Sequence, residues 1–478
     1  MNAAESSRAI AVAAVDLGAT SGRVIVGRVG ADTLEMTSVA RFPNGPVPLA
    51  SGLHWDLTAL YAHVMEGLRA ALREAPEITS IGIDSWAVDY ALLRGERMLG
   101  EPFHYRDERT AVGVDRVHER VSYDELFSRN GLQFLPFTTL YQLAAEDSAV
   151  LDIADDLLLI PDLLAFQLTG ERVAERTNAS TTGLLNATTG EWDEELITTL
   201  GIDRSLLAKL ISPDETIGTL RDDVAAALGA TAPVHVTAVG SHDTASAVVA
   251  VPMDPTTAAY ISCGTWGLVG VEVPSPVLTD EAREARFTNE GGVDGRIRLL
   301  HNVMGLWVLS ETVRGWEREG TTIELPALLS EAAAVTEDVP VFDVDDPRFL
   351  PPGDMPARIA DWFAEHGVPA PTGRAAITRS IIESLAQAFA DTARTAARLG
   401  DVDLQTIHLV GGGALNDLLC QRTADRSGLP VLAGPVEATA LGNILVQGRA
   451  AGAISGDLQT LRDLVARTHP PRRFTPAM

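Results

Sequence analysis

The sequence predicts an α/β protein built from two similar halves, on the strength of three observations. The chain has 478 residues, which is long for one hydrophobic core and favours two large domains. Strand-like runs alternate with segments whose apolar residues recur at helical spacing, as in sheets covered by helices. A glycine-bearing hairpin pattern near the N-terminus is repeated about half a chain later. We therefore expect domains at residues 1–251 and 252–478.

Composition indicates a soluble globular protein that acts on a small molecule. Lys and Arg number 37 against 65 Asp and Glu, and the formal charge of -28 would repel nucleic acid and anionic membranes. No apolar stretch approaches the roughly 18 residues that span a bilayer, and the N-terminus does not resemble a secretion signal. The two cysteines, Cys263 and Cys420, lie far apart. They suit a reducing cytoplasm and exclude a disulfide scaffold or a cysteine–zinc site.

The first hairpin is expected within residues 12–29. An apolar strand ends at Asp16, the turn reads LGATSG, and a second apolar strand follows. We expect Gly18 and Gly22 to supply backbone freedom in this turn. Its N–H groups and hydroxyls would form a cradle for phosphate, and Asp16 could hold a hydrated Mg²⁺ ion on that phosphate. A plain hairpin with a small polar turn is the alternative.

Strands and helices alternate after this hairpin. Helical spacing is expected over residues 57–73, and the strand ITSIGID ends in another acid, Asp84. Two apolar helical segments are expected at residues 134–143 and 157–168, and Gly170 is placed to end the second. Further along, VHVTAVG reads as a strand and TASAVVA as a short helix. The pattern AAYISCGTWGLVGVEV then repeats the opening hairpin. The remaining expected elements are helices at 304–316 and 375–399 and a strand at 406–410 that runs into GGGALN.

Two stretches carry further candidates for chemistry. Asp243 stands at an expected strand-to-helix turn, where the helix dipole favours an ionised carboxylate that could act as a general base. An ordinary helix-capping aspartate is the alternative, and the neighbouring His242 could orient a substrate or be structural. Gly411 to Gly413 open a helix and would let a flat adenosine approach the backbone, or simply form a turn. The phosphate-loop pattern GxxxxGK[ST] does not occur.

Together these stretches resemble the FGGY family of carbohydrate kinases. The resemblance spans residues 12–475 and rests on VDLGATSGRV, SIGIDSWAVDYALL, YRDERT, GLQFLPFTTLYQL, PDLLAFQLTG, SHDTASAV, SCGTWGL, NVMGLW, VGGGALN and AGPVEATALGN. It implies two ribonuclease-H-like domains of the actin and hexokinase type, flanking a cleft for ATP and a sugar. The implied activity is Mg²⁺- and ATP-dependent phosphorylation of the 1-hydroxyl of L-rhamnulose in L-rhamnose degradation. No nucleic acid, membrane or obligate protein partner is expected.

The resemblance also implies roles for individual residues. Asp243 would accept the proton of the sugar hydroxyl. The expected ATP contacts are Ala19, Thr20, Ser21, Gly22, Arg23, Thr265, Ser310 and Gly412. The expected sugar contacts are Ala87, His242, Thr244 and Asn302. Two positions depart from the family pattern: Ala87 replaces a glycine, and Ser310 replaces a glutamine and is too short to reach equally far.

Other readings of the sequence remain open at this stage. Within the family, the alternative substrate is a related ketose such as L-fuculose or L-xylulose. A chaperone-like or actin-like ATPase shares the two-hairpin cleft, but a chaperone would need a further substrate-binding module. In a filament-forming protein, Asp243 would position water instead of a sugar. A catalytically inactive sugar sensor is disfavoured because Asp243 is retained.

Overall fold

The computed structural model describes residues 9–477, which form two compact units. Unit 1 comprises the chain up to Ala250 together with Val273–Leu299 and Ala438–Thr468. Unit 2 comprises Val251–Glu272, Leu300–Glu437 and the residues after Thr468. The division expected from the sequence, a single cut after residue 251, remains a prediction. By packing, two later segments of the chain belong with the first unit.

Unit 1 is built on a six-stranded sheet in the order β12-β13-β6-β1-β2-β3. Its strands are β1 (Ile10–Leu17), β2 (Ser21–Gly30), β3 (Thr33–Pro43), β6 (Ser80–Ser85), β12 (Thr216–Thr219) and β13 (His235–Thr237). Strand β1 pairs antiparallel with β2 and parallel with β6. The expected first hairpin is thereby confirmed. The alternating residues of these strands are buried on both faces, which requires helices on both sides.

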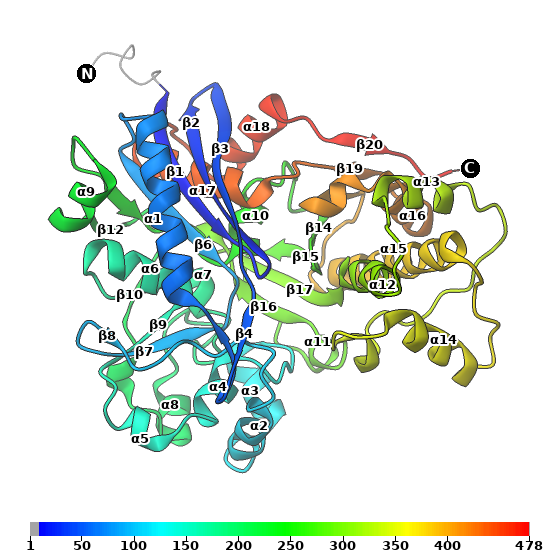
Figure 1. Cartoon of the computed structure of the whole chain (residues 1–478), viewed down its shortest axis with the longest axis horizontal. Helices are drawn as coiled ribbons and strands as arrows, with labels where there is room; N and C mark the ends of the chain where they lie inside the picture. The colour runs from blue at the N-terminus through cyan, green and yellow to red at the C-terminus, as the bar shows by residue number, and fades with distance from the viewer. Residues whose placement is uncertain (1–8, 478) are drawn as a thin grey trace. The chain divides into compact units, whose positions relative to one another are not determined.

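Two helices of unit 1 cover opposite faces of this sheet (Figure 1). Helix α1 (Leu57–Glu74) packs through Gly67 against Val24 of β2. Helix α17 (Ala438–Ala450) packs through Ile444 against Gly27 of β2. Positions 24 and 27 lie an odd number of residues apart and so point to opposite faces of the strand. Helix α10 (Asp243–Val249) packs against α17, and α6 (Ile160–Thr169) packs against β6.

A second hydrophobic core in unit 1 lies under β7 and β9 and includes Leu92, Leu126, Leu143 and Trp192. The remaining elements of the unit are β4 (Pro46–Leu49), β5 (Gly52–Trp55), β7 (Tyr90–Arg94), β8 (Arg97–Met98), α2 (Thr110–His118), α3 (Tyr123–Asn130), α4 (Thr139–Ala144), α5 (Ser148–Leu151), β9 (Asp156–Leu159), β10 (Val173–Glu175), α7 (Arg176–Ala179), α8 (Glu194–Leu200), η1 (Arg204–Leu206), β11 (Lys209–Ile211), α9 (Asp222–Leu228), α11 (Asp280–Glu284), β16 (Thr288–Gly291), η2 (Val293–Gly295) and α18 (Leu458–Thr468).

The second large sheet has the strand order β16-β17-β15-β14-β18-β19-β20, and all of its strands except β16 lie wholly or mostly in unit 2. Those strands are β14 (Ala258–Cys263), β15 (Trp266–Val273), β17 (Ile297–Met304), β18 (Thr406–Val410), β19 (Val431–Ala433) and β20 (Arg472–Phe474). The helices of unit 2 are α12 (Trp307–Arg318), α13 (Leu325–Ala333), η3 (Pro347–Phe349), α14 (Met355–Glu365), α15 (Arg374–Leu399), η4 (Gly412–Leu415) and α16 (Asp417–Ser427). Phe389 of α15 packs directly on Gly267 of β15.

The two units share one pattern of strand connections. In unit 1, β1 pairs antiparallel with β2 and parallel with β6, and β6 pairs parallel with β13. In unit 2, β14 pairs antiparallel with β15 and parallel with β18, and β18 pairs parallel with β19. The repeated hairpin expected from the sequence is therefore part of a repeated fold. Both halves are α/β, as expected.

Three expected helices differ from the structure. Residues 156–159 form strand β9, so the expected helix at 157–168 begins only at Ile160. The helix expected at 134–143 is reduced to α4, because Phe134 is irregular and Leu135 to Thr138 form a turn. Met304 still belongs to β17, and α12 starts at Trp307. In each case a short apolar run was compatible with either type of structure, and pairing with a neighbouring strand or a proline decided the outcome.

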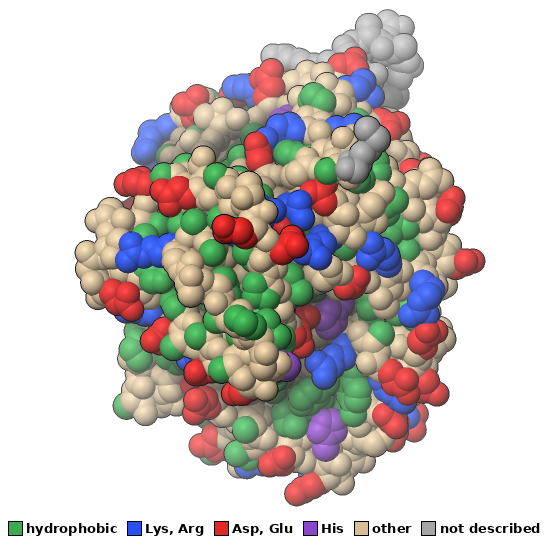
Figure 2. Space-filling model, turned by 90° about the vertical axis from the view of Figure 1, so that its right-hand side faces the viewer, with side chains coloured by type: hydrophobic (Ala, Val, Ile, Leu, Met, Phe, Trp, Pro, Cys, Tyr) green, Lys and Arg blue, Asp and Glu red, His purple; other side chains and the backbone are tan. Residues whose placement is uncertain are grey.

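Charged side chains are mixed over the surface in Figure 2, where basic groups are scattered among acidic ones. This distribution gives no continuous basic field on that face, in keeping with the formal charge of -28. Within residues 9–477, no helix is long and apolar enough to cross a membrane.

The close approach of α10 and α17 generates a test of the packing in unit 1. A Cβ atom on Gly442 would lie 1.8 Å from the Ser246 carbonyl oxygen, so the two helices can only touch through a glycine. We expect Gly442→Ala to destabilise the protein by about 2 kcal/mol or more. Gly315→Ala is the matched control, since its Cβ would meet only side-chain atoms, of Pro356 at 3.3 Å and of Arg318 at 3.9 Å. The measurement is the thermal unfolding midpoint of both variants. Equal midpoints would contradict the close packing of α10 and α17.

Candidate active site

Two acidic side chains lie side by side where β1 and β6 end. The parallel pairing of these strands places Asp16 opposite Asp84. Both are buried, Asp16 with 5% and Asp84 with 0% of its surface exposed. Burial raises the pKa of Asp84 well above its ordinary value, and the nearby carboxylates of Asp16 and Asp243 raise it further. The ends of the two strands therefore concentrate negative charge at one place.

Two groups partly balance this charge. Arg23, opposite Asp16 in the β1–β2 hairpin, brings Nη2 to 2.6 Å from Asp16 Oδ2. Asn443 of α17 donates Nδ2 to Asp84 Oδ2 at 2.6 Å. Gln447 donates to Asn443 Oδ1 at 2.6 Å, which turns the amide N–H of Asn443 toward the carboxylate. Asp84 Oδ1 is buried without a hydrogen-bond partner in the described part of the chain.

The turn between β1 and β2 is closed by its own backbone. Gly18 N–H donates to the Ser21 carbonyl at 2.9 Å, and Asn44 Nδ2 donates to the Gly18 carbonyl at 2.8 Å. Ala19, Thr20 and Ser21 are at least partly exposed, whereas Gly22 is buried. The sequence expectation that Gly18 and Gly22 relax the backbone is wrong, because neither has a positive φ. Gly22 is required because a Cβ there would lie 2.2 Å from the Phe42 ring.

Unit 2 brings its own predicted residues together around the β14–β15 turn. The carbonyls of Gly264 and Thr265 accept from the N–H groups of Leu306 and Trp307, so α12 begins at this turn. Ser310 follows one helical turn later and is exposed. Asn302 lies on β17, where it is partly buried.

Gly411 and Gly413 pack against Cys263 at the end of β14. A Cβ on Gly411 would lie 2.9 Å from the Cys263 carbonyl oxygen, and one on Gly413 would lie 2.5 Å from its Sγ. By contrast, a Cβ on Gly412 would meet nothing within 4 Å, so only the middle glycine offers open backbone. Burial raises the pKa of the Cys263 thiol to about 12, which makes it a packing group.

Asp243 is held beside the end of β6. Ser85 N–H donates to the Ser241 carbonyl at 2.9 Å, and Ser85 forms a parallel bridge with His242. Asp243 then opens α10 as expected, with 32% of its side chain exposed. Its Oδ1 lies 3.1 Å from the Thr244 hydroxyl and 3.4 Å from His242 Nε2. Asp16, Asp84, His242, Asp243 and Thr244 thus belong to one site in unit 1.

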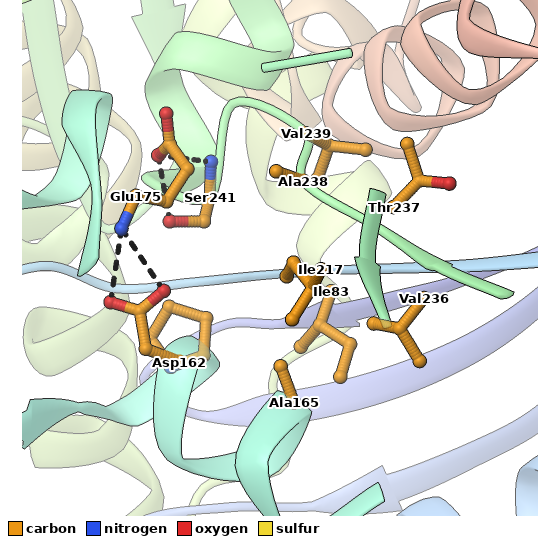
Figure 3. Close-up of a pocket in the computed structure, with 11 residues that line it drawn as sticks. Ile83, Asp162, Ala165, Glu175, Ile217, Val236, Thr237, Ala238, Val239 and Ser241 are labelled. Atoms are coloured by element: carbon orange, nitrogen blue, oxygen red, sulfur yellow. Dashed lines mark hydrogen bonds between the residues drawn. The ribbon is translucent and has the colours of Figure 1, made fainter. Parts of the chain in front are cut away.

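Glu175, which the sequence analysis missed, fixes the loop before Asp243. Its buried carboxylate accepts from the N–H and hydroxyl of Ser241 at 3.0 and 2.8 Å. It also accepts from the N–H and hydroxyl of Thr177, and that hydroxyl accepts from His242 N–H. Burial raises the pKa of both Glu175 and Asp162. Asp162 accepts the Glu175 N–H beside a small, otherwise largely apolar cavity (Figure 3).

A strained turn follows β6 and carries Ala87. Val88 has φ of 68°, an unfavourable backbone conformation for a β-branched residue. Its carbonyl accepts from the Thr139 hydroxyl at 2.6 Å. Ala87 and Val88 are partly exposed, while their flanking residues Trp86 and Asp89 are buried. The strain therefore presents two small apolar side chains next to the loop that carries Asp243.

The buried side chain of Asp89 holds this turn in place through hydrogen bonds. Its Oδ2 accepts from the indole N–H groups of Trp55 and Trp86 at 2.6 and 3.0 Å, and its Oδ1 accepts from Gln142 at 2.8 Å. Burial raises the pKa of Asp89 to about 6, although these donors oppose the shift. Sequence reasoning overlooked Asp89 because a lone acid in an apolar run gives no signal of its partners.

Within residues 9–477, no group of three or more His, Cys, Asp or Glu side chains is arranged to hold a metal ion. A cation at this site would need ligands beyond the side chains of the protein.

The fold defines the class of protein first. Over 98% of this chain, it matches the solved structures of a xylulose kinase from Lactobacillus acidophilus and of Plasmodium falciparum glycerol kinase with ADP, each with a TM-score of 0.77. These matches cover 94% and 95% of the two solved chains, at 18% and 14% sequence identity. At such identities they establish a shared fold alone, that of sugar kinases.

The family follows from the sequence itself. Residues 11–250 match the N-terminal domain and residues 259–451 the C-terminal domain of the FGGY family of carbohydrate kinases. This chain belongs to that family. It is 40% identical over 468 residues to a rhamnulokinase from Bacteroides thetaiotaomicron, covering 97% of this chain and 95% of the relative. A rhamnulokinase from Pectobacterium carotovorum is 41% identical over 474 residues, covering 97% and 93%.

The raised pKa of Asp89 leads to a prediction on stability. A folded-state pKa of about 6, against an ordinary 3.8, means that Asp89 favours folding at low pH. That contribution, up to about 3 kcal/mol, is lost as the pH rises through about 6. Asp89→Asn cannot titrate, so the stability advantage of wild type over the variant should shrink between pH 4.5 and pH 7.5. Denaturant unfolding of both proteins across this pH range measures the difference in their free energies of unfolding. A difference that does not change with pH would contradict the prediction.

Proposed function

We propose that this chain is an ATP-dependent kinase that converts L-rhamnulose to L-rhamnulose 1-phosphate in the breakdown of L-rhamnose. The observation that carries the proposal is the identity of about 40% to rhamnulokinases over nearly the whole length of both chains. The reducing cytoplasm is its proposed location, in keeping with two buried free cysteines. Its proposed partner is the sugar, without an obligate protein partner.

Asp243 is the proposed general base. Its carboxylate would take the proton of the 1-hydroxyl as the sugar oxygen forms a bond to the γ-phosphorus, while the bond from that phosphorus to ADP breaks. Its partial exposure leaves it accessible to a substrate, and its attachment to Glu175 through Ser241 keeps the loop rigid. Precise placement matters because phosphoryl transfer depends chiefly on position and charge stabilisation.

The proposed ATP contacts come from both hairpin turns, from the glycine stretch after β18 and from helix α12. The partly exposed residues Ala19, Thr20, Ser21 and Arg23, with the Gly22 backbone, would face phosphate on the side of unit 1. Thr265 and Gly412 would contribute on the side of unit 2. The open backbone at Gly412 supports this assignment. Ser310 would replace the usual glutamine contact with a shorter side chain, and water could fill the difference.

Mg²⁺ is the proposed metal, with Asp16 as the residue that would hold it. The site suits a cation because Asp16 and Asp84 are in register, Asp84 Oδ1 lacks a hydrogen-bond partner in the described chain, and Arg23 supplies only one positive charge beside Asp16. Mg²⁺ commonly binds one or two carboxylates together with waters and substrate phosphates. When bound, it would neutralise charge on the phosphates.

The proposed sugar contacts are Ala87, His242, Thr244 and Asn302. In unit 1, Ala87 follows β6 and His242 bridges to Ser85 of the same strand, which supports a shared role. Ala87 adds a methyl group where the family has glycine. A methyl group brings no hydrogen bond, and one methylene in a pocket discriminates by about 1–3 kcal/mol. A related ketose, L-fuculose or L-xylulose, is the second candidate substrate.

Replacement of the base tests the mechanism. Asp243→Asn should lower ketose phosphorylation by about 10²-fold or more, because the amide cannot accept the hydroxyl proton. ATP binding, measured by calorimetry, should stay within a few-fold of wild type. A variant that retains more than about a tenth of the wild-type turnover would exclude Asp243 as the base.

The substrate assignment is tested by specificity constants. We expect wild type to prefer L-rhamnulose, with L-fuculose slower but detectable, in a coupled assay over a panel of ketoses. Ala87→Gly should change kcat/KM for L-rhamnulose by less than about 100-fold, as a single methyl group allows. A preference for L-fuculose, or no turnover of L-rhamnulose, would overturn the substrate while leaving the family intact.

A further inference from the structure

A buried ion pair stands behind the proposed base. Arg298, on β17, has a side chain with 0% exposure, and its Nη2 lies 3.0 Å from Glu290 Oε2 on β16. Both residues belong to the Val273–Leu299 segment of unit 1. Burial opposes ionisation of Glu290, but Arg298 and His242 outweigh burial and place its pKa below the ordinary value. Glu290 is therefore a carboxylate at neutral pH.

Stability does not explain why this pair is retained. Two charges lose their hydration when they are buried, and the ion pair often fails to recover that loss relative to apolar side chains of similar size. Glu290 Oε2 makes its contact with Arg298 at ion-pair distance without hydrogen-bond geometry, and Arg298 Nη1 is likewise buried with no hydrogen-bond partner among the described residues, which adds a further cost. A role outside stability is thus the better explanation.

The pair contacts His242. Arg298 Nη2 lies 3.0 Å and Glu290 Oε2 lies 3.2 Å from His242 Nδ1. On the other side of the ring, His242 Nε2 lies 3.4 Å from Asp243 Oδ1. The imidazole therefore connects the buried ion pair to the proposed base.

The chemistry of these contacts places a hydrogen on Nε2. A lone pair there would face the Asp243 carboxylate and be repelled by it. With hydrogen on Nε2, Nδ1 either accepts from Arg298 in a neutral ring or donates to Glu290 in a charged one. The ion pair thus provides a partner for Nδ1 in both the neutral and the charged ring. In both forms of the ring, Nε2–H points toward Asp243 Oδ1.

Asp243 Oδ1 then faces one hydrogen-bond donor, the Thr244 hydroxyl, and the His242 ring at ion-pair distance. The Thr244 hydroxyl lies 3.1 Å from it, on the same oxygen that faces His242 Nε2. Among the described residues, no hydrogen bond engages Oδ2. The carboxylate is held by one oxygen, and the other is left for a substrate hydroxyl.

We infer that Glu290 and Arg298 are positioning residues that orient His242 so that Asp243 Oδ1 is anchored and Oδ2 accepts the sugar proton. This inference rests on the proposed function of Asp243 as the base. It assigns a role to a pair that does not itself touch the substrate.

Glu290→Gln tests the inference by removing one charge while keeping the shape of the side chain. We expect kcat to fall by about 10-fold or more and KM for ATP to stay within about 3-fold. The low-pH limb of the pH profile of kcat/KM should move to lower pH, because loss of a negative charge makes neighbouring groups release protons more readily. The charged groups around His242 are Asp243, Glu290 and Arg298, with Glu175 and Asp84 beyond Ser241 and Ser85.

Glu383→Gln is the matched control. Glu383, on α15, is a buried glutamate that pairs with Arg379, Arg422 and Arg426. Its loss should lower the unfolding temperature but leave kcat and the pH profile within about 2-fold and 0.2 pH unit of wild type. A Glu290→Gln variant that behaves in the same way would overturn the positioning role.

Ring-nitrogen NMR of the histidines separates this inference from the proposed function. The His242 signals are assigned by their loss in His242→Gln, and Glu290→Gln should shift them. Unchanged His242 signals would overturn the inference even if the enzyme phosphorylates L-rhamnulose. If the His242 signals shift but the protein phosphorylates no ketose, the contacts between Glu290, Arg298 and His242 are supported and the proposed function is wrong.

Discussion

The parallel pairing of β1 with β6 is the constraint on which the rest of unit 1 depends. It places Asp16 beside Asp84, and two carboxylates this close and this buried repel each other strongly. Two neighbouring side chains reduce that repulsion: the cation of Arg23 on β2 and the amide of Asn443 on α17. Because α17 supplies the amide, a segment near the C-terminus is required to complete the acidic site at the ends of β1 and β6.

The same constraint explains the close packing around Asp243. Helix α10 approaches α17 so closely that Gly442 cannot carry a side chain, so the helix that Asp243 opens and the helix that carries Asn443 are positioned together. Glu175 ties the preceding loop to α7, and the bridge from Ser85 to His242 ties it to β6. A base positioned by three separate elements suits phosphoryl transfer, in which placement supplies most of the catalysis.

The sequence predicted the parts of this arrangement that are local. Both hairpins, the strand before Asp84, the long helix α15 and the place of Asp243 at a helix start follow from periodicity and turn residues. Hydrogen-bond partners distant in sequence, such as Glu175 for Ser241 and Asn443 for Asp84, leave no local pattern and were missed. Strand β9 was misassigned because its three leucines fit a helix as well as a strand until their pairing partner is known. Gly22 of the first turn serves packing against Phe42 instead of backbone freedom, which only the fold reveals.

Our central proposal is that the carboxylates of unit 1 serve transfer of a phosphoryl group to a sugar hydroxyl and not to water. The direct measurement is the ratio of sugar phosphate formed to ATP consumed, with the position of the phosphate read by phosphorus and carbon NMR. With L-rhamnulose, the account predicts a ratio near one, phosphate on the 1-oxygen, and little ATP consumption in the absence of sugar. ATP hydrolysis at the same rate with and without sugar, or phosphate on another oxygen, would contradict it.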